Sequence, residues 1–94
     1  MTLTHTAEAD LAEIWAFIAE DSDKAADRFI DAIYDHAKGL LIHPETGSDR
    51  SEFAPELRAS FFRRYAIYYT FDARQIVIVR VAHGARDQAA LFPT

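Results

Sequence analysis

The hydrophobic residues of this chain change their spacing near its middle, and this change constrains the fold more than any other feature of the sequence. Between residues 7 and 41 apolar residues recur every three or four positions, as in amphipathic α-helices. Between residues 57 and 82 the chain carries short runs rich in β-branched and aromatic residues, which is typical of β-strands. We therefore expect a helical first half and a β-sheet in the second.

The first half predicts two helices. We expect one over residues 7–20, capped by Thr6, and one from a cap at Asp21 or Ser22 to about residue 41, where HPETG ends it. So short a connection makes them an antiparallel hairpin. Phe17 falls off the apolar stripe of the first helix and is expected to be exposed. The stripe itself, with the tryptophan expected in the core, is Leu11, Ile14, Trp15 and Ile18.

Three strands are predicted in the second half, over residues 57–62, 65–71 and 75–82. The short segment DARQ makes the last two antiparallel neighbours, and a brief first strand can form in MTLT. The order becomes β-α-α-β-β-β: an α+β fold with a small antiparallel-rich sheet and the helical hairpin on one face, in a single domain over residues 1–94. We expect the other face to be uncovered, with Arg58, Ser60, Phe62 and Arg64 in one row on it.

The charge is distributed unevenly along the chain. Residues 1–49 carry 11 acidic and three basic side chains, a net charge of −8, whereas residues 50–94 carry four acidic side chains and seven arginines, a net charge of +3. This pattern fits an acidic, solvated helix face beside a mixed sheet. It also fits an arginine-bearing surface for an acidic peptide or a nucleic acid.

Composition and motifs disfavour several classes of protein. The absence of Cys excludes disulfides and cysteine-based zinc sites and fits the cytoplasm, and no signal peptide or membrane-spanning stretch is visible. The four His residues lack metal-ligand spacing, and no glycine-rich phosphate-binding motif occurs. We therefore expect no metal and no cofactor.

The segment HGARD at His83–Asp87 is the one compact group of reactive side chains. His83 could act as a general base and Arg86 could hold a phosphate or carboxylate, while Gly84 allows the chain to turn. In the structural alternative, Arg86 and Asp87 pair with neighbours and fix the C-terminal tail. These residues alone favour the structural alternative.

The ordered set of motifs resembles the ParE branch of the RelE/ParE toxins of bacterial type II toxin–antitoxin systems. The most specific pieces are A-x-x-D-L-x-x-I-W at Ala7–Trp15, H-P-x-x-G at His43–Gly47 and H-G-x-R-D at His83–Asp87. The resemblance implies a toxin neutralised by a ParD-like antitoxin, whose C-terminal segment lies along the helical hairpin and whose N-terminal part binds DNA. This chain departs from the family in having only MTLT before its first helix, which could leave that sheet edge open for antitoxin pairing.

The two branches of the family share a fold and differ in target: ParE-type toxins inhibit DNA gyrase, and RelE-type toxins cut mRNA on the ribosome. The strand Arg of the nucleases corresponds here to Ala66, their C-terminal Tyr corresponds to Phe92, and no Lys follows Lys38. Arg86 is retained, and His83 keeps a nuclease alternative open. We therefore expect a gyrase inhibitor that is not an enzyme, with an mRNA endonuclease or a non-toxic antitoxin-binding relative as alternatives.

The residues expected to carry these functions form three groups. A nuclease would use His83 and Arg86. Contacts with the target or the antitoxin are expected at Arg58, Arg64, His83, Arg86 and Asp87. The antitoxin groove on the helical hairpin is expected to draw on Leu11, Trp15, Phe17, Ile18, Phe29 and Ile33. The expected partners are proteins, with nucleic acid reached only through the antitoxin and no membrane.

Overall fold

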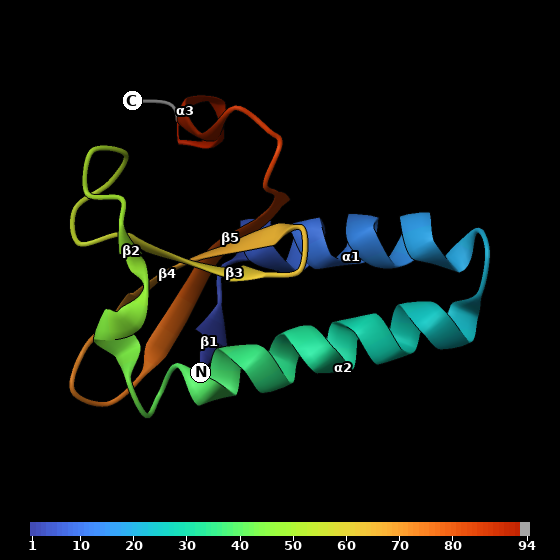
Figure 1. The fold of residues 1–94 in the computed structure, drawn as a ribbon, viewed down its shortest axis with the longest axis horizontal. Helices are drawn as coiled ribbons and strands as arrows, with labels where there is room; N and C mark the ends of the chain where they lie inside the picture. The colour runs from blue at the N-terminus through green and yellow to red at the C-terminus, as the bar shows by residue number, and fades with distance from the viewer. Residues whose placement is uncertain (93–94) are drawn as a thin grey trace.

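A computed structural model describes residues 1–92 and shows the expected order of elements with two additions, β2 and α3 (Figure 1). The elements are β1 Thr2–Leu3, α1 His5–Ala19, α2 Asp23–Gly39, a 3₁₀ turn at Pro44–Thr46, β2 Ser48–Asp49, β3 Arg58–Phe62, β4 Tyr65–Phe71, β5 Ile76–His83 and α3 Gln88–Leu91. The predicted α+β fold is confirmed. Within residues 1–92, none of the helices has the length and apolarity needed to cross a bilayer.

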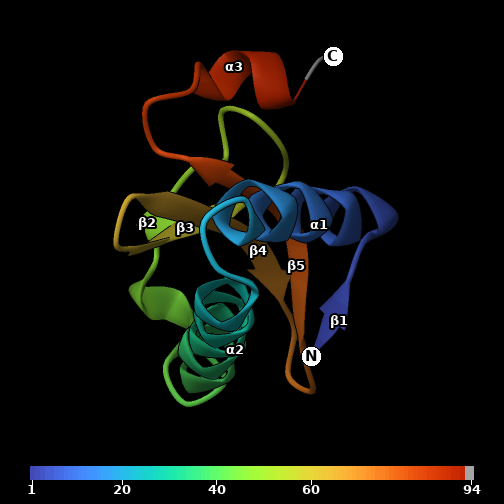
Figure 2. The same cartoon turned by 90° about the vertical axis from the view of Figure 1, so that its right-hand side faces the viewer.

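One five-stranded sheet, in the order β1-β5-β4-β3-β2, organises the molecule. β1 pairs with β5 in parallel, and the other neighbours are antiparallel. Helices α1 and α2 form the predicted hairpin and lie on one side of this sheet (Figure 2). A core of buried residues fills the space between them, with Leu11 and Ile14 from α1, Ile33 from α2 and Ile67 and Ile78 from the sheet.

The first helix begins two residues earlier than its sequence predicts. Thr4, not Thr6, is the N-cap: its hydroxyl accepts the Ala7 N–H and also donates to the Val79 carbonyl of β5. The second bond explains the shift, because a tertiary contact decides between two threonines that satisfy the local rule equally. Of the two predicted caps of α2, Asp21 and Ser22, the structure has Ser22.

The sequence predicted an uncovered face opposite the helices, and this prediction was wrong. A second cluster covers it, made by the loop after β2 and by the C-terminal segment around α3: Leu57, Ala59, Ala66, Tyr68, Ala82 and Leu91 are buried there, with Phe53 and Phe92 packed against them. The covering residues belong to segments with no helical or strand period, so hydrophobic periodicity could not reveal them.

The predicted row Arg58, Ser60 and Phe62 lies on the helix-covered face instead. His36 of α2 is hydrogen-bonded through Nε2 to the Ser60 hydroxyl at 2.8 Å, and the ring centroids of Phe29 and Phe62 are 5.9 Å apart. Arg64 lies outside the strand, in the β3–β4 turn. The alternation was applied correctly, but which row faces the helices depends on packing that the strand sequence does not encode.

A β-bulge breaks the alternation of β5. Tyr68 pairs with Arg80 and Tyr69 with Ile78, so Val79 has no partner on β4. Beyond the bulge the rows exchange faces: Ile78 and Val81 both enter the helix-side core. Strict alternation along residues 76–83 would place these two side chains on opposite faces, and the bulge prevents this.

Candidate interaction site

Two turns meet at one end of the sheet and bring together residues distant in sequence. The Gly84 N–H donates to the Arg64 carbonyl at 2.7 Å, which ties the segment after β5 to the β3–β4 turn. The Tyr65 ring meets the His83 ring edge-on, with centroids 5.5 Å apart. Arg64, His83 and Arg86, three of the predicted contact residues, therefore lie at the same end of the sheet, and all three are exposed.

A hollow of about 170 Å³ opens beside this end, between α1 and the last residues of β5. Its walls are mixed in character, since Ile14, Phe17 and Tyr65 supply apolar surface, while Glu13 and Arg86 supply opposite charges. His83, Asp10, Val81 and Ala82 complete the lining. The arrangement suits an amphipathic ligand better than a purely ionic one.

One of the two ring nitrogens of His83 is engaged in a hydrogen bond within the turn. The Ala85 N–H donates to its Nδ1 at 3.1 Å, so that lone pair is already engaged. A neutral ring in this arrangement carries its proton on Nε2, which leaves no free lone pair to accept a proton from a substrate.

Arg63 is a member of this site that the sequence did not single out. The β3–β4 turn consists of Arg63 and Arg64, and Arg63 alone of these two has a positive φ, at 54°. Such a φ normally favours glycine. Such a backbone costs a non-glycine residue about 1–2 kcal/mol. The guanidinium carbon lies 4.9 Å from the Phe62 ring centroid and 5.5 Å from that of Phe29, so cation–π contacts help to hold it.

Arg58 lies at the other end of β3 and holds a loop. Its Nη1 donates to the carbonyls of Glu45 and Gly47, at 3.0 and 2.9 Å. The Tyr69 hydroxyl donates to the Pro44 carbonyl and accepts the Gly47 N–H, and a Cβ on Gly47 would lie 2.3 Å from that hydroxyl oxygen. The H-P-x-x-G motif therefore has a structural role, as an anchored turn that requires glycine.

Asp87 also has an internal partner, because its Oδ1 accepts the Ala89 N–H and caps α3. The structural alternative for HGARD holds for Asp87, which bonds to a neighbouring residue. The tail folds back onto the sheet through Leu91. Arg86 is exposed and is free to contact a partner.

The predicted groove residues divide by exposure. Leu11 and Ile33 are buried in the core, whereas Ile18 and Phe29 are half-buried. Phe17 is exposed as predicted, at 69%. Trp15 was expected in the core but is 37% exposed, with its Nε1 donating to Asp27 Oδ1 at 2.8 Å. A helical stripe shows which side of a helix is apolar, but not how far the covering sheet extends beneath it.

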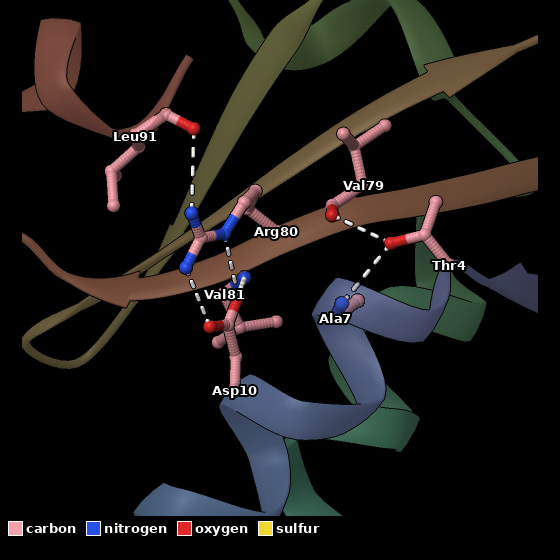
Figure 3. A network of polar contacts seen from close by, with 7 residues as sticks. All are labelled: Thr4, Ala7, Asp10, Val79, Arg80, Val81 and Leu91. Atoms are coloured by element: carbon pink, nitrogen blue, oxygen red, sulfur yellow. Dashed lines mark hydrogen bonds and ion pairs between the residues drawn. The ribbon is translucent and has the colours of Figure 1, made fainter. Parts of the chain in front are cut away.

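The buried Asp10 and the half-buried Arg80 form an ion pair that the sequence did not predict (Figure 3). Arg80 donates from Nη2 and Nε to the two carboxylate oxygens at 2.7 and 3.0 Å, and its Nη1 reaches the Leu91 carbonyl at 3.3 Å. The bonds to Asp10 raise the pKa of Arg80 above its ordinary value. The signal was present in the sequence: Arg80 is a charged residue inside the apolar run IVIVRVA and needs a partner.

Asp10 also completes the sheet edge that the short β1 leaves uncovered. β1 pairs only with Val77 and Ile78, and beyond it Asp10 Oδ2 accepts the Val81 N–H at 2.9 Å. Thr4 satisfies the Val79 carbonyl in the same way. Side chains of α1 thus take over part of the role of the missing strand residues.

Comparison with known proteins identifies the family. The model of the ParE toxin of the type II toxin–antitoxin system parDE matches residues 1–88. The chain is 32% identical over 79 residues to Toxin RelE3 of Caulobacter vibrioides, covering 83% of this chain and 86% of that protein. A chain of the solved chromosomal ParDE TA system from P. aeruginosa shares the fold, with a TM-score of 0.69, 22% identity and coverage of 88% of this chain and 95% of that one. The chain belongs to the ParE family of type II toxin–antitoxin toxins.

Proposed function

We propose that this toxin acts by binding and inhibiting DNA gyrase, without catalysing a reaction itself, and that a ParD-like antitoxin neutralises it. The ParE family match supports this choice of branch. A relative named RelE3 favours keeping an mRNA endonuclease as the alternative. Because gyrase acts on the chromosome, the proposal also implies a cytoplasmic protein.

The observation that carries the proposal is the state of the positions where a nuclease of this fold would act. Ala66 is 1% exposed and has no functional group to offer. Phe92 has no hydroxyl, and its ring packs edge-on against Tyr68 with centroids 5.0 Å apart. His83 has its Nδ1 lone pair engaged. These positions thus offer no ready general base for a 2′-hydroxyl, which supports the proposal.

Tyr68, the phenol packed against Phe92, is a poor substitute for the missing hydroxyl. It is 1% exposed beneath Phe92, and burial raises the pKa of its hydroxyl. A raised pKa makes the phenolate scarcer at neutral pH, so Tyr68 is less able to serve as a base.

The antitoxin is proposed to use the helical hairpin. Trp15 and Phe17 present exposed aromatic surface on α1, and the half-buried Ile18 and Phe29 continue it. Aromatic side chains of this kind are common anchors in protein–protein interfaces. DNA would be reached only through the antitoxin.

Expression of the toxin in bacterial cells tests the target. Gyrase inhibition predicts that a reporter plasmid loses negative supercoils while its transcripts keep intact coding regions, and that co-expression of the cognate antitoxin restores supercoiling. Transcripts cut within codons, with unchanged plasmid topology, would establish the nuclease alternative instead. Normal growth with neither effect, despite complex formation with the antitoxin, would indicate a non-toxic relative.

A further inference from the structure

Three arginines lie at one end of the sheet and have no carboxylate partner among residues 1–92. Arg63 and Arg64 form the β3–β4 turn, and Arg86 follows β5. Within residues 1–92 the ion pair of the structure is Asp10–Arg80, so none of these three guanidiniums is neutralised there. The bond from the Gly84 N–H to the Arg64 carbonyl keeps the two segments together. The result is a solvent-facing positive surface on two segments whose backbones are tied together.

Apolar surface lies directly beside this charge. Phe17 and Ile14 of α1 face Tyr65 and Val81 of the sheet across the 170 Å³ hollow that Arg86 also lines. Phe17 is 69% exposed, although large apolar side chains are usually covered. An apolar side chain of a partner can enter here within reach of an arginine.

The edge of β5 at the hollow offers backbone hydrogen bonds as well. The Gly84 N–H is directed to β4, so alternation turns the peptide groups of Val81 and His83 to the opposite edge. The bond from the Val81 N–H to Asp10 confirms this direction. No strand within residues 1–92 pairs with that edge beyond Ile78, which leaves the Val81 carbonyl and the His83 N–H facing the hollow.

We propose that this end of the sheet docks a short, extended segment of a protein partner, in which an apolar residue is flanked by carboxylates. The apolar side chain packs on Phe17 and Tyr65, the backbone bonds to the β5 edge, and the carboxylates pair with Arg64 and Arg86. Each part of the segment matches one feature of this end of the sheet: the hollow, the β5 edge or the arginines. The inference deepens the proposed function by giving the chemistry of the partner, and rests on it only in taking that partner to be a protein.

The charges around the site disfavour a nucleic acid as the occupant. Glu13 lies inside the hollow. The helical hairpin extends past the end of the sheet on the same side (Figure 1), and exposed carboxylates stand at its tip, from Glu20 and Asp21 in the connection and Asp23 at the start of α2. A long polyanion lying along the arginines would meet the acids of the helix connection, whereas a segment of a few residues avoids that connection and meets only Glu13, beside which its apolar residue packs.

The test is a fluorescence-anisotropy titration of the intact protein with a labelled peptide of alternating leucine and glutamate. We expect saturable binding that weakens with salt, and a loss of about tenfold or more in affinity for the Arg64→Ala/Arg86→Ala double variant, since each charge-assisted contact contributes severalfold. Phe17→Ala should also weaken binding. Arg74→Ala is the matched control, because Arg74 is an exposed arginine in the turn at the opposite end of the sheet.

Three outcomes would overturn the proposal: no binding of the acidic peptide, equal binding by the double variant, or stronger binding of a leucine–lysine peptide or a single-stranded oligonucleotide. All substituted residues are exposed, so each variant is expected to fold, and thermal melts of each variant check this. Inhibition of gyrase by the same preparations is scored separately. Retained inhibition without peptide binding would refute the docking site alone and leave the proposed target standing.

Discussion

Asp10 links α1 to β5 and, through Arg80, to the C-terminal tail. Its carboxylate accepts from the Arg80 guanidinium and from the Val81 N–H, and Arg80 in turn reaches the Leu91 carbonyl of the tail. Removing one member of a buried pair leaves the other charge without compensation, which costs more than the pair contributes.

Asp10→Ala is therefore expected to lower the free energy of unfolding by about 3–5 kcal/mol, as measured by urea denaturation. Glu13→Ala, one turn further along α1 and exposed, should change it by no more than about 0.5 kcal/mol. Similar values for the two variants would show that the ion pair does not hold α1 to the sheet.

Trp15→Ala provides the opposite case. A core tryptophan would cost about 3–5 kcal/mol on truncation. Since Trp15 is 37% exposed and has one hydrogen bond to Asp27, we expect a loss of about 1–2 kcal/mol, together with a marked loss of antitoxin binding. Ile14→Ala, at a buried position of the same helix, should destabilise the protein more. A larger loss of unfolding free energy for Trp15→Ala than for Ile14→Ala would show that Trp15 is a core residue.

At the scale of elements, the sequence predicted what periodicity encodes and missed what it does not. Both helices and the three long strands were found, because each repeats one spacing over several turns or residues. The β5 bulge, the two-residue β2 and the short α3 have no such repeat. The N-cap at Thr4 was decided by β5, 75 residues away in sequence.

The tail is the element whose removal is most informative. Leu91 and Phe92 cover Tyr68 and Leu57, and burying two such side chains contributes about 3–5 kcal/mol. A chain ending at Asp87 should lose stability of this order and bind a hydrophobic dye, while its far-ultraviolet circular dichroism still shows α1 and α2. A chain ending at Phe92 is the control. Unchanged dye binding in the shorter chain would mean that the tail does not protect the second face.

At the scale of the whole molecule, the two buried tyrosines make the free energy of unfolding decrease at high pH. Burial raises the pKa of Tyr68 and Tyr69 above the ordinary value of about 10. Below that value both states are protonated and stability is complete. As the pH rises further, the unfolded state ionises first, so stability falls.

We therefore expect the urea midpoint to drop above a pH of about 10. About half of the tyrosinate absorbance, from two of the four tyrosines, should appear only together with unfolding. Ionisation of all four before any loss of structure would contradict the burial of Tyr68 and Tyr69.

The family and the fold could also be predicted from the sequence, because ordered motifs and periodicity can be recognised without knowing the tertiary contacts. It could place Arg64, His83 and Arg86 only as a list. Their meeting depends on the bond between Gly84 and Arg64, and Arg63 joins them through a backbone conformation that its residue type does not suggest.

The central claim is that this chain inhibits gyrase as a binding protein. Its most direct test is supercoiling of relaxed plasmid by purified gyrase, with increasing amounts of the purified toxin. We predict dose-dependent inhibition that the cognate antitoxin reverses. His83→Ala should not abolish this inhibition, as the loss of a catalytic base would. Full supercoiling at a large excess of toxin, with cleavage of ribosome-bound message by the same sample, would contradict it.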